Sequence, residues 1–230
     1  MKKYCFTITS LLVLVMGITS CSDEENKTQT QVASRPTVPI MANELQIGTQ
    51  IWMTKNLNVS RYRNGDPIPQ VTNPTQWSNL TTGAWCYYAN NTANGIVYGK
   101  LYNWFAVNDP RGLAPVGWHV PSDDEWTALT TCLGGVPVAG GKMKTTRTWS
   151  LPNVGATNSS GFSGVGAGER ANNGGGFYFI GDTSRFWSST SSGPTINYAA
   201  WSLSIYAAYQ VTSRNDAIVQ DGMSVRCIKD

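Results

Sequence analysis

The sequence predicts an α+β fold that has two helices, short antiparallel strands and long irregular loops. Apolar residues recur at helical spacing in 98–108 and in 123–133, which predicts the two helices. Residues 200–211 alternate between apolar and polar types, as in a strand with one buried face. The segment 134–176 is rich in Gly, Asn, Ser and Thr, so we expect irregular structure there.

The composition favours an extracellular module with a large aromatic core. Only 13% of the 230 residues are charged, which is about half the usual globular share, and the chain holds 9 Trp and 23 Gly. The formal net charge is +3, and it falls to +1 if Lys2 and Lys3 leave with a leader peptide, because 15 of the 17 basic residues then face 14 acidic ones. No field of a single sign remains, so nucleic acid is not an expected partner.

The N-terminal segment has the features of a bacterial export signal. A basic start precedes an apolar run at 11–16 that is too short to span a membrane, so residues 1–20 are expected to be a signal peptide. The segment ends in Ile18-Thr19-Ser20-Cys21, which resembles a lipobox and makes Cys21 the expected lipid-attachment residue. The alternative is ordinary cleavage, with Cys21 as an incidental thiol.

Residues 21–43 are expected to form a lipidated, flexible tether. The segment is polar, contains Pro36 and Pro39 and lacks hydrophobic periodicity. It begins with the acidic run Ser22-Asp23-Glu24-Glu25, which resembles the export signal of Bacteroides-type surface lipoproteins. This run predicts a lipid-anchored protein of the outer membrane that is exposed at the cell surface. A solvated acidic tether without an export role is the alternative.

Residues 44–230 have the pattern of one folded domain. Apolar residues around Gly48 predict a hairpin that buries Trp52, and 56–59 is expected to be a further strand. The first helix, 98–108, ends where Asp109-Pro110 follows. Further short strands are expected at 85–88, 177–180, 186–190 and 223–228.

The second helix has a clear start signal. Ser122 and Glu125 form a capping-box pattern ahead of the helix 123–133, in which each side chain bonds a backbone N–H of the first turn. The acidic residues of that turn complement the helix dipole. Trp118 and Trp126 flank the turn and are expected to anchor the core. We therefore assign structural roles to these four residues.

Five motifs follow one another along residues 44–230. They are Ile47-Gly48-Thr49-Gln50-Ile51-Trp52-Met53 with Asn56-Leu57, Tyr98-Gly99-Lys100-Leu101-Tyr102-Asn103-Trp104, Gly117–Trp126, Phe186-Trp187-Ser188-Ser189-Thr190, and Ser224-Val225-Arg226-Cys227. In this order they resemble the family called the Fibrobacter succinogenes major paralogous domain. The resemblance implies a secreted or surface module with a C-type-lectin-like fold, distantly related to formylglycine-generating-enzyme domains.

The resemblance also implies a disulfide between Cys86 and Cys227, which occupy positions that the family usually fills with Cys. Many relatives carry another Cys just before the Pro-x-Gly-Trp run, where this chain has Ala114. This departure leaves Cys132 as a competing partner for Cys227. Outside a disulfide, Cys132 is expected to be a buried small apolar residue rather than a reactive thiol.

The residues provide no catalytic set, and neither a cofactor nor a metal site is expected. His119 is the only histidine, and no G-x-S-x-G elbow accompanies it, so a structural role is favoured over a catalytic one. The carboxylates at 123–125 point to different sides of a first helical turn, so capping explains them better than metal binding. The sequence triplets of calcium-dependent sugar-binding lectins are absent, although Asp182 or Asp216 with loop carbonyls leaves a structural ion open.

The strongest functional signal lies near the C-terminus. Tyrosines and amide side chains gather there, as is typical of adaptable recognition surfaces. The alternative is that half of the aromatic residues belong to the core. The ligand-binding candidates are Tyr198, Tyr206, Tyr209, Gln210, Arg214 and Asn215.

Residues 195–219 suggest a further hypothesis. Some proteins with a C-type-lectin-like fold are targets of diversity-generating retroelements, which mutate template adenines, mostly in AAC codons. Gln210 and Trp201 cannot arise in that way and would belong to the fixed frame. An ordinary diverged surface is the favoured alternative. The residues of types that AAC codons can become are Ile196, Asn197, Tyr198, Ala199, Ser204, Tyr206, Tyr209, Asn215 and Asp216.

The sequence therefore predicts a surface lipoprotein with one C-type-lectin-like domain that binds an extracellular glycan or protein through its C-terminal loops and strands. The alternatives are a carbohydrate-capture protein for glycan uptake, a retroelement-diversified variable receptor and a structural surface component. An enzyme is the least favoured alternative.

Overall fold

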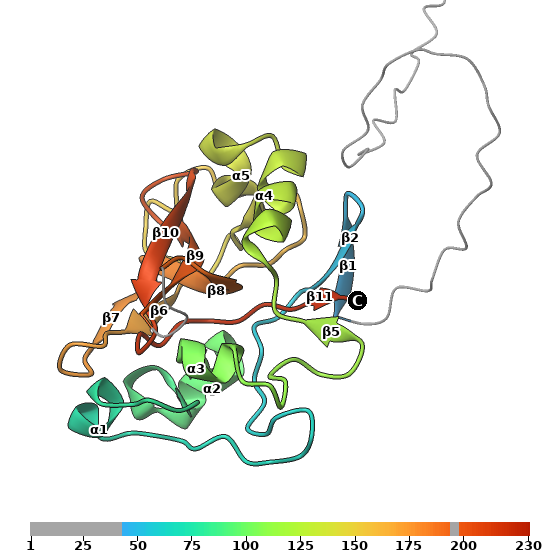
Figure 1. Cartoon of the computed structure of the whole chain (residues 1–230). Coiled ribbons are helices and arrows are strands. Elements are labelled where there is room, and N and C mark those ends of the chain that lie inside the picture. The colour runs from blue at the N-terminus through green and yellow to red at the C-terminus, as the bar shows by residue number, and fades with distance from the viewer. Residues whose placement is uncertain (1–42, 194–197) are drawn as a thin grey trace, which may run out of the picture.

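The computed structural model describes residues 43–193 and 198–230. In these ranges, helices lie beside three small sheets, which confirms the α+β class (Figure 1). The predicted signal peptide, Cys21 and the tether up to residue 42 lie outside the described residues, as do Ile196 and Asn197.

The first sheet joins the two ends of the domain, in the order β1-β2-β11-β5. Strands β1 (Glu44–Ile47) and β2 (Gln50–Met53) form the predicted hairpin, and Trp52 is fully buried as expected. Strand β11 (Ile228–Lys229) pairs with both β2 and β5 (Trp118–His119). The C-terminus therefore lies beside the first hairpin (Figure 1).

The second sheet has the order β10-β9-β8-β6-β7 and carries most of the regular pairing. The predicted strand 200–211 is shorter than expected, because the chain turns after Tyr206 and returns as an antiparallel partner. Only the pairing of β6 with β8 is parallel among the described strands of this sheet. The strands are β6 (Ala167–Arg170), β7 (Phe177–Ile180), β8 (Thr183–Ser191), β9 (Ala199–Tyr206) and β10 (Thr212–Ile218).

Helix α4 (Asp123–Cys132) confirms the strongest local prediction. The Ser122 Oγ accepts from the Glu125 N–H, and the Glu125 carboxylate accepts from the Ser122 N–H at 2.8 Å, so both halves of the capping box are present. Two further helices, α1 (Pro74–Ser78) and α5 (Val136–Met143), were not predicted. Both have Pro in the first turn, where it is tolerated.

The predicted helix 98–108 is wrong. The chain forms α2 (Thr92–Tyr98), then β4 (Leu101–Tyr102), then α3 (Trp104–Val107). Gly99 ends α2 at φ +76°, and a Cβ there would lie 2.9 Å from the Leu57 carbonyl oxygen. Asn103 then caps α3 by accepting from the Ala106 N–H. The apolar spacing arises because the short strand and the short helix both face the core.

Of the other predicted strands, two are shorter than expected and one, 56–59, is not formed. Strand β3 (Trp85–Cys86) pairs with β4 and covers only half of 85–88. Residues 56–59 are extended but form no ladder, because Leu57 bonds Val225 on one side and Lys100 on the other. In 223–228, Met223 and Ser224 make isolated bridges, to Tyr102 and Phe186, and only Ile228 belongs to a strand. In 56–59 and 223–227, single backbone bonds replace a continuous ladder.

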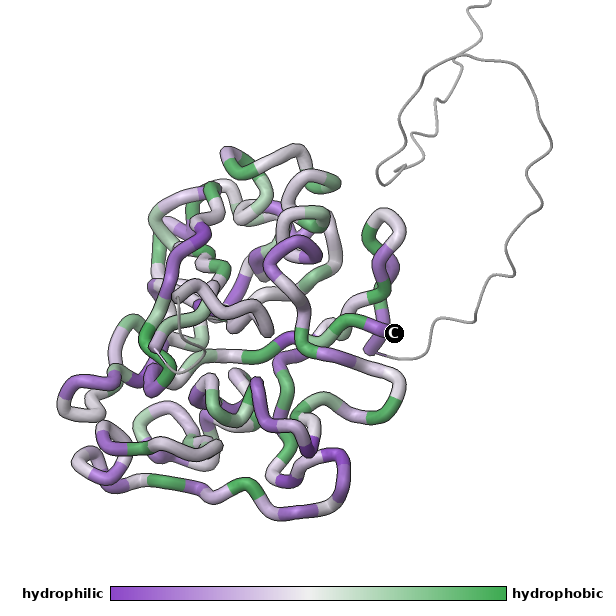
Figure 2. Tube along the Cα trace, viewed as in Figure 1, coloured by the Kyte–Doolittle hydropathy of each residue, from purple (hydrophilic) through white to green (hydrophobic). Residues whose placement is uncertain are grey.

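An aromatic cluster forms the core below α4. The Trp126 ring lies 4.8 Å from that of Trp52 and 5.7 Å from that of Phe186, measured between centroids, and Phe162 packs against all three. Trp118 is also buried, but it belongs to a second cluster, around Trp104 and Trp187. Apolar residues are otherwise scattered in short stretches along the chain (Figure 2).

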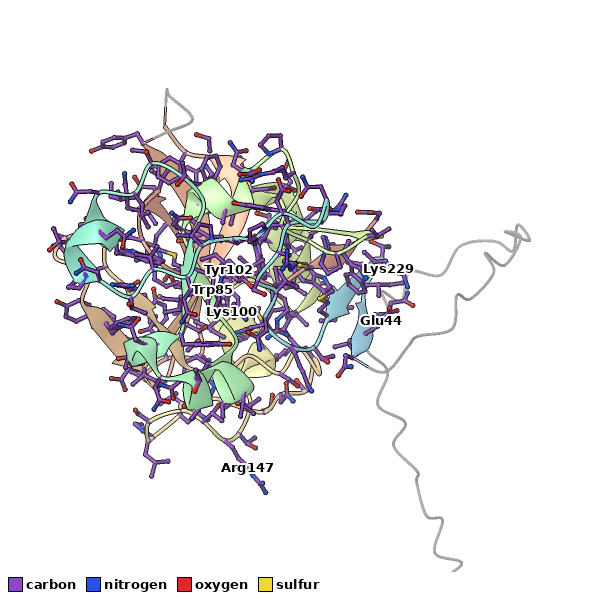
Figure 3. The ribbon with its side chains drawn as sticks, turned by 90° about the horizontal axis from the view of Figure 1, so that it is seen from below. Glu44, Trp85, Lys100, Tyr102, Arg147 and Lys229 are labelled. Atoms are coloured by element: carbon purple, nitrogen blue, oxygen red, sulfur yellow. The ribbon has the colours of Figure 1, made fainter. Side chains whose placement is uncertain are left out.

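Buried cations hold the irregular segments of the chain. Lys100, Lys144, Arg170 and Arg226 are each at most 4% exposed, and none of them has a carboxylate partner among the described residues. Arg170 donates to the carbonyls of Val71, Thr72 and Gly175 and lies over the Trp77 ring. Such side chains carry only donors, so they satisfy carbonyls that no ladder reaches. Figure 3 shows Lys100 beside Trp85 and Tyr102 inside the molecule, whereas Arg147 stands out from the surface.

The predicted disulfide between Cys86 and Cys227 is not formed. Both residues are buried free thiols. Cys86 packs with Trp77 in one hydrophobic cluster and Cys227 packs in another, so their side chains fill different parts of the interior. Burial raises the pKa of each thiol to about 12, which makes both unreactive. Because Cys227 is a free thiol, the competing pair with Cys132 is absent as well.

Candidate functional site

A groove of about 280 Å³ lies between α4 and the β9–β10 hairpin, and we call it the α4 groove. Its floor includes Trp126 and Leu203, which belong to the aromatic core cluster. Gly135 and Val136 close it at the start of α5. The groove therefore stands on the buried aromatic core, which suits a site that must keep its shape.

Hydroxyl groups dominate the polar lining of the α4 groove. Thr212 is 2% exposed, and its hydroxyl has no hydrogen-bond partner among residues 43–193 and 198–230. An unsatisfied buried hydroxyl costs about 1–3 kcal/mol, so it suits a position where a ligand supplies the missing bond. The hydroxyl residues of the lining are Thr127, Thr130, Thr131, Ser202 and Thr212.

One ion pair lies at the edge of the groove. The Arg214 Nε lies 2.7 and 2.8 Å from the two carboxylate oxygens of Asp123, and the guanidinium carbon lies 3.2 Å from the centroid of the Trp201 ring. Asp123 is thus more than a helix-dipole residue, because it fixes Arg214 across the groove. The pair neutralises the charge of the lining, which otherwise holds no Lys, Arg, Asp or Glu.

His119 lies between two carboxylates. Its Nε2 lies 2.9 Å from Glu125 Oε1 and its Nδ1 lies 2.7 Å from Asp230 Oδ1. Burial disfavours the charged ring, but the hydrogen bonds and charges of the two carboxylates outweigh it and raise the pKa of His119 above its ordinary value. Since both nitrogens already contact carboxylates, the ring ties the capping box to the C-terminal residue.

This arrangement predicts a pH-dependent part of the stability. The folded pKa of His119 is raised above its unfolded value of about 6.5, so the contribution is complete below that pH and is lost as the pH rises through the folded pKa. The side chain is 39% exposed, so we expect less than about 1 kcal/mol. Urea unfolding at about pH 6 and about pH 9 should show a smaller pH-dependent change in His119→Gln than in the wild type. An equal change in both proteins would refute the assignment.

The six ligand-binding candidates do not form one site. Arg214 alone lines the α4 groove. Asn215 follows it on β10, so its side chain lies on the opposite face of the sheet, 3.4 Å from the Ser204 Oγ. Tyr198 precedes β9 and Tyr206 ends it, which places them roughly 25 Å apart along the strand.

The other candidates gather at the β9–β10 turn. The Tyr206 and Tyr209 rings meet edge to face at 6.2 Å, and Gln210 is exposed beside them. The buried Lys144 Nζ donates to the carbonyls of Tyr206 and Tyr209, and these two hydrogen bonds fix the turn to the interior of the domain. This turn packs closely on α5, because the Gly141 N–H donates to the Gln210 carbonyl. The β9–β10 turn therefore presents an exposed aromatic surface that is separate from the α4 groove.

The family can be assigned at this point. The sequence model of the Fibrobacter succinogenes major domain matches residues 45–229, which is nearly all of the domain described above. The chain belongs to this family. No curated protein and no solved structure matches it. The family match confirms the resemblance that the five motifs carry.

Two further findings concern the described part of this Fibrobacter succinogenes major domain. Within 43–193 and 198–230, no group of three or more His, Cys, Asp or Glu side chains is arranged to hold a metal ion. No helix in the same ranges is both long and apolar enough to cross a bilayer.

Sequence reasoning missed most of the groove. Its hydroxyl residues are common surface types and come from two distant parts of the chain. Asp123 and Arg214, which meet across it, are 91 positions apart. The one local signal was the run of threonines on α4, at 127, 130 and 131, whose spacing places them on neighbouring faces of a helix.

Proposed function

We propose that the protein is a surface binding module that takes a neutral segment of an extracellular glycan in the α4 groove, on a C-type-lectin-like fold. The observation that carries the proposal is the chemistry of the lining: threonine hydroxyls, of which that of Thr212 is buried without a partner in the described residues, next to apolar side chains, with charges that cancel. Sugar hydroxyls can exchange hydrogen bonds with the Thr side chains, and their apolar faces suit Val136, which lines the groove and is 55% exposed.

The groove has room for only a small part of a glycan. Its volume of about 280 Å³ lies just below the roughly 300–1,000 Å³ that ligand pockets span. A protein partner would need a much larger patch, about 800 Å² on each side. The ligand would therefore be held by one or two of its units, while the rest of the chain stays outside.

A glycan array tests this proposal, if the wild type is compared with two variants in which one of two neighbouring Asp residues is replaced by Asn. Asp123→Asn removes the charge that fixes Arg214 and should weaken binding about tenfold, because a charge-assisted bond contributes about 1.5–3 kcal/mol at best and the pair is partly exposed. Asp124→Asn is the matched control: Asp124 is exposed, lies one position away and does not line the groove. Binding should stay intact in that variant. Equal affinities for both variants, or no glycan bound by the wild type, would sink the proposal.

Adhesion to a protein is the second candidate, and one specific surface favours it. Tyr178 and Phe179 are 47% and 52% exposed on β7, at the edge of the second sheet. Phe179 has a φ of +64°, which is a genuine outlier for an aromatic residue and fits a functional constraint. A host-protein array with Tyr178→Ser separates this candidate, since glycan binding in the α4 groove should not respond to it.

The location that we propose is the outer face of the outer membrane, through a lipid on Cys21. The supporting observations are the lipobox-like Ile18-Thr19-Ser20-Cys21 and the acidic run after it. Protease shaving of intact cells checks the exposure, because a protein that stays fully protected must face the periplasm. We further propose that the module has no catalytic activity; both nitrogens of its only histidine contact carboxylates, which supports this.

A further inference from the structure

A second groove, of about 470 Å³, lies on another side of the fold, and we call it the Arg226 groove. It is formed by the extended segment 54–58, the end of α2 and the loops at 145 and 163–165. None of its lining residues also lines the α4 groove. Its polar side chains come from Thr54, Lys55, Asn56, Asn58, Thr145, Ser163 and Arg226.

The lining is positively charged and holds no carboxylate. Arg226 is fully buried and bonds only to neutral acceptors: the carbonyls of Met53 and Phe162, and the Asn56 Oδ1. Burial lowers its pKa to about 9, so the guanidinium keeps its charge at neutral pH. Neutral dipoles solvate this charge but do not cancel it, and the positive field extends into the groove.

Two lysines add to this field. Lys55 lines the groove, is exposed and has no ion-pair partner among the described residues. Lys100 lies behind the lining, 4% exposed, with its Nζ 2.6 Å from the Asn58 Oδ1 and over the Trp85 ring. Two of the three cations thus line the groove, and the third is bonded to Asn58 of its lining. An isolated cluster of like charges is unfavourable unless an anion or solvent compensates it.

We propose that the Arg226 groove binds the oxyanion group of an acidic ligand, a carboxylate or a sulfate ester, with Lys55 as its direct contact and the buried Arg226 as a fixed positive charge behind it. The rim favours a group carried by a larger molecule, because Ile96 and Val97 are 87% and 49% exposed there and offer an apolar contact. The contrast with the α4 groove is chemical: Arg214 is neutralised by Asp123, whereas no carboxylate lines the Arg226 groove.

Calorimetric titration of the purified protein tests this site. The probes are trigalacturonate, which carries carboxylates, sodium sulfate, and maltotriose as a neutral trisaccharide. We expect trigalacturonate, sulfate or both to bind, and Lys55→Gln to weaken the binding about fivefold, the factor that one contact between unit charges at 4 Å gives in water. Raising the salt from about 20 mM to about 150 mM should weaken it too, because the Debye length shortens to about 8 Å.

The matched control is Lys142→Gln, which removes the same charge from a lysine that lines neither groove. It should leave the anion affinity unchanged. Binding of trigalacturonate alone would make a sugar acid the ligand, and binding of sulfate would make the oxyanion group sufficient. Three results would overturn the proposal: no anion bound, maltotriose bound as tightly as trigalacturonate, or equal affinities in Lys55→Gln and the wild type. Loss of anion binding in Arg214→Ala would also overturn it, since the anion would then occupy the α4 groove.

Discussion

Trp126→Ala is expected to lower the free energy of unfolding by about 3–5 kcal/mol, the usual cost of truncating a buried large aromatic residue. The side chain is 2% exposed and its ring contacts Trp52, Phe162 and Phe186. Its Nε1 also donates to the Trp187 carbonyl at 3.3 Å, so the substitution leaves that oxygen without a donor. Because domains are stable by only about 5–15 kcal/mol, this substitution removes a large share of the total stability.

Urea or thermal unfolding measures this effect, and Tyr198→Ala is its control. Tyr198 is 64% exposed, so its truncation should change the stability by no more than about 0.5 kcal/mol. If Trp126→Ala were as stable as Tyr198→Ala, the aromatic cluster would not be the centre of the core.

Lys144→Met is expected to cost about 3 kcal/mol or more, because it removes the donor from three carbonyls at once and each orphaned group costs about 1–3 kcal/mol. The Lys144 Nζ lies 2.8 Å from the Val154 oxygen, 2.7 Å from that of Tyr206 and 2.9 Å from that of Tyr209. Burial lowers its pKa to about 8, so the ammonium is still charged at neutral pH. Met keeps the length of the apolar stem, and the loss therefore reports the hydrogen bonds rather than a cavity.

The local effect should be largest at the β9–β10 turn. Hydrogen exchange at 206–211 should become faster in Lys144→Met, because that turn loses its anchor. Lys142→Met is the matched control, since Lys142 lies two positions earlier, is only half-buried and donates to no carbonyl in the described chain. Similar stability of the two variants would contradict the role that we assign to buried cations.

Local signals predicted the parts of the fold that depend on local physics. The capping box of Ser122 and Glu125, followed by apolar spacing, located α4 to within one residue of its observed end. The Gly48 turn predicted the first hairpin, because a residue at positive φ is needed between two short strands. In both places, residues within about ten positions of each other determine the local structure.

Apolar spacing gave a wrong prediction at 98–108, where a short strand and a short helix follow each other in place of one long helix. Leu101, Tyr102 and Phe105 do face the core, but from a strand and a second helix rather than from one helix. The backbone turns at Gly99, and Lys100 then goes inward to bond Asn58. A lysine is almost never buried without a partner, so its role could not be predicted before the carbonyls around it were known.

The candidate sites were beyond sequence reasoning for a different reason. Each depends on contacts between residues that lie far apart in the chain, such as Asp123 with Arg214 or Arg226 with Met53. The predicted tyrosines are exposed as expected at Tyr198 and Tyr209, but they stand at opposite ends of β9. Composition identified a recognition-type region, and only the sheet register showed which of its residues share a face.

The central claim is that ligand recognition takes place in the α4 groove, and footprinting tests it most directly. The purified protein would be labelled with a carbene reagent, with and without the array glycan that binds most tightly. We predict protection of the groove segments 127–136, 202–203 and 212–214, and no protection of Tyr178 and Phe179. Protection confined to β7 or to the Tyr206–Tyr209 turn, with the groove segments unchanged, would contradict the account.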